Sequence, residues 1–246
     1  MKRGKYTILI LVITASIIVF LLLNLLLGSV SIPFASVWNI LTGGEGDPIA
    51  WQNIILKSRL PQALTALVAG AGLSISGLQM QTIFRNPLAG PSVLGISSGA
   101  SLGVAFVVLL SGQLGGVALS RLGFIGEVAL SIAAIAGALS VMGLIVLASR
   151  KVAGSVTLLI IGVMIGYIAN AVIGVLKFFS VEEDIKAYVI WGLGSFARVS
   201  GNQMMLFVTI MAVIIPLSFL LIKPLNLLML GDGYARNLGL NIHRAR

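Results

Sequence analysis

The sequence predicts an all-α membrane protein, a polytopic helical bundle with about six transmembrane helices. Of its 246 residues, 58% are hydrophobic and only 9% are charged, and the mean hydropathy is +1.10. These values lie far outside the range of soluble globular domains. Apolar runs of 18 or more residues match the ~20 residues that an α-helix needs to cross the hydrocarbon core. The alternating ten-residue segments of a membrane barrel are absent, so the bundle is helical.

Six apolar runs follow one another along the chain, and a turn-rich stretch at 43–48 lies in the first long connection. The first run follows Lys2 and Arg3 and is too long for a typical signal peptide, so we expect it to be retained. The expected spans are 7–27, 61–83, 93–111, 126–148, 155–178 and 204–222.

Small residues within the spans predict close helix packing. The second span is rich in Ala, Gly and Ser, and GxxxG pairs occur at Gly99 with Gly103 and at Gly162 with Gly166. Such residues let helix backbones approach closely in lipid.

Two polar connections are expected to carry short helices. One lies within 179–203 at the outer interface. The other runs from Asp232, whose carboxylate offsets the helix dipole, to Gly239, which ends it.

The distribution of positive charge predicts the orientation of the chain. The net charge of +9 is spread over helix ends, so a nucleic-acid partner is not expected. With a cytoplasmic N-terminus, ten Lys and Arg residues fall inside and six outside, which favours this topology and a cytoplasmic Arg246. The inner ones are Lys2, Arg3, Lys5, Arg85, Arg150, Lys151, Lys223, Arg236, Arg244 and Arg246.

Several kinds of chemistry find no support in the residues. No span has an ionisable residue near its middle, as proton relays and ion-coupling sites do, and no phosphate-binding GxxxxGK[ST] loop occurs. Energy for uphill transport would therefore come from another polypeptide. The stretch 95–99 matches GxSxG, but the sole histidine, His243, lies in the basic tail, so a serine hydrolase lacks its base. With no cysteine and one histidine, neither a metal site nor a cofactor is expected.

The polar break at 85–91, Arg-Asn-Pro-Leu-Ala-Gly-Pro, separates two apolar spans. Its prolines stop the second helix, and Asn86 precedes a proline, a position biased away from the α conformation. It is either an ordinary loop or a constriction at the cytoplasmic end of a pathway.

Four blocks, in the right order, give the chain a resemblance to a known family. It resembles the FecCD-type permeases of iron-siderophore, haem and cobalamin ABC importers. The blocks are RLPQ at 59–62, GLQMQ at 77–81, RNPLAGPSVLGISSGA at 85–100 and KPLNLLMLGDGYARNLGL at 223–240.

The resemblance implies a multi-pass permease of the bacterial inner membrane. It would pair with a second permease copy, with cytoplasmic ATPase subunits that bind ATP and Mg, and with an extracytoplasmic binding protein. The chain would hold no cofactor itself. Residues 1–246 would form one transmembrane permease domain, with 223–246 as a cytoplasmic coupling segment.

The resemblance also implies three sets of site residues. The ATPase-coupling set is Gly231, Asp232, Ala235, Arg236, Leu238 and Gly239; the binding-protein docking set is Arg59, Lys57 and Gln62, where Gln62 replaces an arginine of the family; the gate and pathway set is Asn86, Pro87, Leu88, Ser155 and Val156.

Three questions stay open at this point. Members of the family have about ten spans, so the chain is expected to be incomplete at its C-terminus and inactive alone. The cargo is a ferric siderophore, haem or cobalamin, with the siderophore favoured. The alternative function is a stand-alone six-span channel or facilitator.

Overall fold

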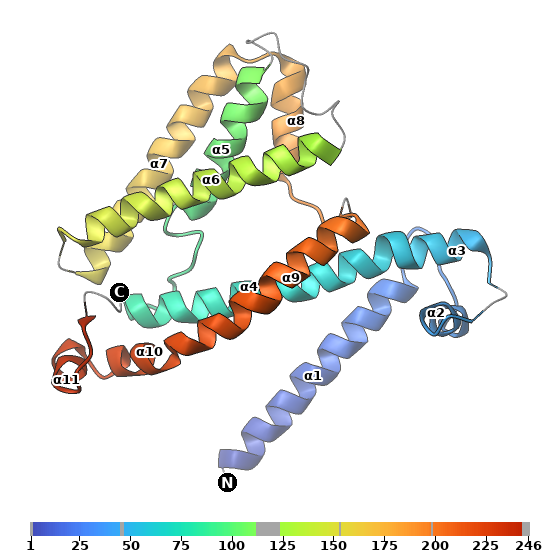
Figure 1. The fold of residues 1–246 in the computed structure, drawn as a ribbon, viewed down its shortest axis with the longest axis horizontal. Coiled ribbons are helices and arrows are strands. Elements are labelled where there is room, and N and C mark those ends of the chain that lie inside the picture. The colour runs from blue at the N-terminus through green and yellow to red at the C-terminus, as the bar shows by residue number, and fades with distance from the viewer. Residues whose placement is uncertain (1, 45–46, 112–123, 153, 198, 243–246) are drawn as a thin grey trace. The chain divides into compact units, whose positions relative to one another are not determined.

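The structure, a computed structural model, describes residues 2–44, 47–111, 124–152, 154–197 and 199–242, and every regular element in these ranges is a helix (Figure 1). The predicted all-α class is therefore confirmed for the described part of the chain. Two compact units make up the chain, Met1–Gly72 with Ser195–Pro216, and Leu73–Gly194 with Leu217–Arg246. Each unit has buried apolar clusters of its own.

The first unit is built around the end of the N-terminal helix. Pro33 and Pro48 precede two short helices, where the fixed φ of proline suits a helix start. Leu25, Val37 and Ile55 are buried together and join these helices to α1. The elements are α1 (Lys2–Leu26), α2 (Phe34–Leu41), α3 (Ile49–Ile54), the π-helical turn η1 (Ile55–Arg59), the first half of α4 (Leu60–Phe84) and most of α9 (Gly201–Ser218).

The helix that contains the second predicted span begins earlier than expected. The sequence predicts a span over 61–83, but the helix runs without a break from Ile49 to Phe84. The π-helical turn at Ile55–Arg59 carries the chain through the charged residues that mark the predicted boundary. The polar connection before the span is therefore partly helical.

In the second unit, α6 crosses α5 and packs on it (Figure 1). A Cβ atom placed on Gly137 of α6 would lie 2.1 Å from the carbonyl oxygen of Gly99, and one on Gly103 would lie 2.1 Å from that of Ala133. On α7, Gly162 and Gly166 also make close backbone contacts, because a Cβ atom placed on Gly95 would lie 2.6 Å from the carbonyl oxygen of Gly162 and 3.0 Å from the nitrogen of Gly166. The predicted close packing at both GxxxG pairs is confirmed. The elements are α5 (Ile96–Ser111), α6 (Phe124–Ser149), α7 (Ser155–Phe179), α8 (Glu182–Gly192), the 3-10 turn η3 (Phe219–Leu221), α10 (Ile222–Met229) and α11 (Asp232–Asn237).

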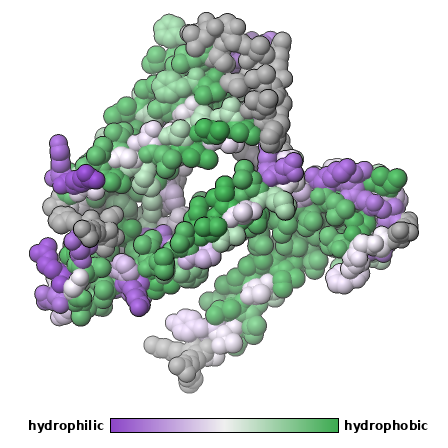
Figure 2. All heavy atoms as spheres, viewed as in Figure 1, coloured by the Kyte–Doolittle hydropathy of each residue, from purple (hydrophilic) through white to green (hydrophobic). Residues whose placement is uncertain are grey.

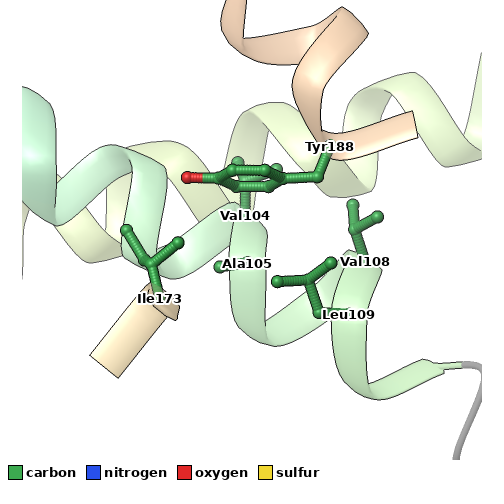
Figure 3. Packing of buried hydrophobic residues seen from close by; sticks show 6 residues of the cluster. All are labelled: Val104, Ala105, Val108, Leu109, Ile173 and Tyr188. Carbon is green, nitrogen blue, oxygen red and sulfur yellow. The ribbon is translucent and has the colours of Figure 1, made fainter. Parts of the chain in front are cut away.

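The largest buried cluster of this unit joins α5, α7 and α8. Figure 3 shows Tyr188 reaching from α8 across Val104 and Ala105 of α5, with Ile173 of α7 beside it. The short helix predicted within 179–203 is thus present and packed against α5.

Most of the apolar surface of the long helices is not covered within the chain. Five helices in the described part are long and apolar enough to span a membrane, and at most 28% of any apolar window is buried. Figure 2 shows hydrophobic surface along α1 and α6, with hydrophilic residues gathered around α11. The third predicted span, 93–111, is a shorter apolar helix that begins only at Ile96, because the chain turns at Gly95 with a φ of +72°.

Candidate functional site

The polar break after α4 is a tight, hydrogen-bonded turn. The amide of Asn86 donates to the carbonyl of Gln81 (3.1 Å) and that of Arg85 to Thr82 (3.3 Å), the pair of bonds of a Schellman helix end. Asn86 Oδ1 then accepts a bond from the amide of Leu88 (2.9 Å). The side chain of Leu88 is 82% exposed. The predicted end of the helix is confirmed, and the turn presents an apolar side chain at its tip.

The second half of the predicted gate lies at the start of α7. Val156 is 67% exposed, and the Ser155 side chain lies outside what the structure describes. Phe84, which precedes the gate residues 86–88, and Leu159, which follows the gate residues 155–156, pack against one buried cluster around Leu94. Residues next to both predicted gate segments therefore contact the same apolar cluster.

The predicted coupling segment forms two short helices joined by a glycine. Gly231, with a φ of +108°, turns the chain between α10 and α11, and Gly239, at +85°, ends α11 as predicted. Ala235 is completely buried, whereas Arg236, Leu238 and Gly239 are exposed. Residues 243–246 of the segment and the side chain of Asp232 lie outside the described part.

Three exposed residues of this segment were missed by the sequence reasoning. Tyr234 is 71% exposed, Met229 66% and Leu230 60%. Together with Leu238 they give a polar, basic segment an apolar surface, which is typical of a surface that binds another protein. The presence of an aromatic residue in a short polar helix would have indicated from the sequence that Tyr234 belongs to this surface.

One side-chain contact links the turn after α4 to this segment. Arg85 donates a hydrogen bond from Nη2 to the carbonyl oxygen of Leu228 at 2.8 Å. Leu228, in the last turn of α10, is 2% exposed. A predicted gate segment and the predicted coupling segment are therefore joined directly, which the sequence did not indicate.

The predicted docking residues differ in accessibility. Lys57 is exposed and Gln62 is half-buried, but Arg59 is only 7% exposed. The Arg59 guanidinium donates to the carbonyl oxygens of Leu25 (2.7 Å), Leu26 (3.1 Å) and Val30. Arg59 was expected to face a partner protein, but in this structure its guanidinium donates hydrogen bonds to the carbonyl groups at the C-terminal end of α1. A docking role stays a prediction, and Lys57 is the cation of this set that is available on the surface.

A further polar group lies on α8. Burial raises the pKa of the Tyr188 phenol above its usual value, and a hydrogen bond with Ser101 partly offsets this. The ammonium of Lys177 lies 4.8 Å from the centre of the Tyr188 ring, within range of a cation–π interaction. This group fixes α8 to α5 and to the end of α7.

The long apolar helices, their glycine-mediated packing and the polar end segment define a polytopic helical membrane protein. Residues 16–246 match the model of the FecCD transport family. The chain therefore belongs to the FecCD transport family.

Several relatives and a solved structure are similar to this chain. The hemin transport system permease protein HmuU of Yersinia pestis is 33% identical over 89% of this chain and 63% of its own length. A probable iron chelatin transport system permease protein of Helicobacter pylori is 40% identical over 76% of this chain and 53% of its own length. The vitamin B12 import system permease protein BtuC of Salmonella paratyphi A is 36% identical over 80% of this chain and 55% of its own length. A structure described as an inward-facing conformation of a metal-chelate type ABC transporter superimposes with a TM-score of 0.78, at 27% identity, over 97% of this chain and 70% of that one. The chain thus spans 53–63% of the length of these curated relatives.

Proposed function

We propose that this chain forms the membrane pathway of an ATP-driven importer whose cargo is an iron chelate, haem or cobalamin. The match of residues 16–246 to the FecCD transport family carries this proposal. The names of the relatives supply the cargo classes. Among them a ferric siderophore is our first choice, and the protein lies in the bacterial inner membrane with its N-terminus in the cytoplasm.

Two features of the structure support the partners that such an importer needs. The exposed apolar residues around α11, Tyr234 and Leu238 among them, suit a groove on a soluble ATPase subunit that binds ATP and Mg. The long helices bury little of their surface within the chain, which leaves faces for lipid and for a second permease copy. A substrate-binding protein would dock near the exposed Lys57.

Uptake by the assembled transporter tests the proposal. The protein that carries this chain is reconstituted in proteoliposomes with its ATPase and binding protein, and uptake of a radiolabelled ferric siderophore, haem and cobalamin is compared. We expect uptake of one of them to require both ATP and the binding protein. Equal uptake without ATP would support the alternative, a stand-alone channel or facilitator, and would contradict the importer.

A further inference from the structure

The backbone at Arg85 has a conformation that normally requires glycine. Its φ is +47°, and among the described residues it is the one non-glycine residue with a positive φ. L-residues avoid this left-handed region because Cβ approaches the following carbonyl oxygen. An arginine at this place therefore weakens the backbone turn that it occupies.

Two other helix ends in the chain show what the same turn looks like without that conflict. Helix α2 ends with bonds from Gly44 to Asn39 (2.8 Å) and from Gly43 to Ile40 (3.3 Å), and α11 with bonds from Leu240 to Ala235 (2.9 Å) and from Gly239 to Arg236 (3.0 Å). The residue at the left-handed position is Gly43 in one and Gly239 in the other. The turn geometry alone therefore favours glycine, and the side chain of Arg85 must supply what a glycine cannot.

The guanidinium of Arg85 is bound at the C-terminal end of α10. It donates to the carbonyl oxygen of Leu228, which also accepts a bond from the amide of Gly231 (3.2 Å). A cation is favoured there because the last carbonyl groups of a helix carry partial negative charge. The Leu228 side chain is almost fully buried, so this carbonyl is a fixed point rather than part of a mobile surface.

Arg85 is also joined, through one peptide bond, to the turn at 86–88. That turn is rigid because the side chain of Asn86 accepts a bond from the amide of Leu88 and its carbonyl one from Ala89 (3.0 Å). A displacement of α10 is thus passed to Leu88 through one side chain and one tight turn.

We propose that Arg85 is a positioning residue that transmits movement of α10 and α11 to the turn at Asn86–Leu88, and so couples ATP hydrolysis to opening of the pathway. This inference rests on the proposed function, in which an ATPase binds at α11. Arg85 touches neither ATP nor cargo in this role. Its function is to keep the turn and the ATPase-binding helices moving together.

The test compares three variants in the assembled transporter. Arg85→Gly removes the guanidinium but gives the left-handed position the residue it prefers, so the turn itself is retained. Arg85→Lys keeps a cation that can still reach the carbonyl. Arg150→Gln removes another exposed arginine next to a helix C-terminus and is the matched control.

The readout is substrate uptake per ATP hydrolysed, together with ATPase binding and melting temperature. For Arg85→Gly we expect ATPase binding and melting temperature to stay at the wild-type level while uptake per ATP falls at least about fivefold, the lower end of usual coupling effects. Arg85→Lys should restore part of the ratio, and Arg150→Gln should not change it.

Each contrary result has a defined meaning. An unchanged ratio in Arg85→Gly, even with both rates reduced, overturns the inference. Loss of ATPase binding together with a lower melting temperature also overturns it, because Arg85 would then only support the fold. If the wild-type protein itself shows no ATP-dependent uptake, the proposed function fails and not Arg85 alone.

Discussion

Arg59 is the most deeply buried charged side chain of the docking set, and its contacts explain why it is stable there. The last carbonyl groups of a helix have no partners within the helix, and burial without a partner is costly. Arg59 supplies donors for Leu25 and Leu26 at the end of α1. A Cβ atom placed on Gly28 would lie only 2.6 Å from Nη2 of Arg59. Because glycine has no Cβ, the chain leaves room for the guanidinium at this position.

Replacing this arginine should destabilise the protein. We expect Arg59→Gln to lower the free energy of unfolding by about 2–3 kcal/mol, since hydrogen bonds to charged groups contribute ~1.5–3 kcal/mol each and part is regained by the amide. Thermal unfolding in detergent measures the effect. Lys57→Gln, a change to the exposed cation two residues away, is the control and should leave the melting temperature unchanged. Equal melting temperatures for both variants would contradict the role of Arg59 at the end of α1.

A second residue-scale prediction concerns Tyr188 at high pH. Because burial raises the pKa of its phenol in the fold, the unfolded chain loses that proton first as the pH rises. The protonated Tyr188 phenol makes its full contribution to the stability of the fold at pH values below 10.0, the usual pKa of a tyrosine phenol. That contribution is lost as the pH rises through the higher pKa that this phenol has in the folded protein. We expect Tyr188→Phe to lose melting temperature less steeply than the wild type above pH ~10, since it has no phenol to ionise. Parallel pH profiles would contradict this.

Residue roles were the least predictable part of the chain. The sequence predicted the end of α4 from Asn86 and Pro87, and the end of α11 from Gly239, because these signals are local. It predicted neither the contact of Arg85 with Leu228 nor that of Arg59 with Leu25. Both join residues far apart in sequence, 143 positions in one case and 34 in the other, and depend on the packing of helices that no local pattern encodes.

At the scale of elements, the crossing of α5 and α6 depends on glycine. The backbones touch where Gly137 meets Gly99, so any side chain on Gly137 must push the helices apart. We expect Gly137→Ala to destabilise the protein by about 1–3 kcal/mol, the usual cost of overpacking. Thermal unfolding in detergent again provides the measurement.

The same helix contains the matched control. A Cβ atom on Gly143 would meet nothing within 4 Å. Gly143→Ala should therefore be neutral or slightly stabilising, because alanine favours a helix more than glycine does. If both substitutions had the same effect, close packing at Gly137 would not be the reason for its cost.

Elements were predicted well where their signals are periodic and long. Each predicted span has a helix in the structure, and both GxxxG pairs lie at close contacts. The predicted ends of α4 and α5 agree with the structure to within one residue, but the predicted starts of two helices differ. The helix that contains α4 begins earlier, because α3 and η1 continue it back to Ile49, and α5 begins later, because the chain turns at Gly95.

At the scale of the whole molecule, the orientation of the chain can be tested directly. The protein has no cysteine, so each introduced thiol is a unique label site. The charge distribution predicts that Lys57→Cys and Lys186→Cys react with a membrane-impermeant maleimide added from the periplasmic side. Lys151→Cys and Asn237→Cys should react only after the membrane is opened. All four positions are exposed in the structure, so poor access within the fold would not explain a failure to react. The reverse pattern would mean that the N-terminus lies outside the cytoplasm.

The fold class follows from composition alone, because little else than a membrane can cover so much apolar surface. The two sequence-distant segments that form the first unit, by contrast, carry no pattern that pairs them. Their association is a property of tertiary packing, as the contact of Gly72 in α4 with Met211 in α9 illustrates.

The π-helical turn at Ile55–Arg59 has a consequence for how the helix that contains α4 tolerates changes in length near its N-terminal end. A π-helical turn holds one residue more than an α-helical one. Deleting Ser58 would allow a regular α-helical turn to form in its place, and because a π-helical turn and an α-helical turn both complete one revolution, Lys57 and Arg59 would keep nearly the directions that they have now. Deleting a residue from the regular part of α4 would instead rotate one part of the helix against the other by about 100° around the helix axis. The π-helical turn is thus the place in this helix where a change of one residue in length can be absorbed locally.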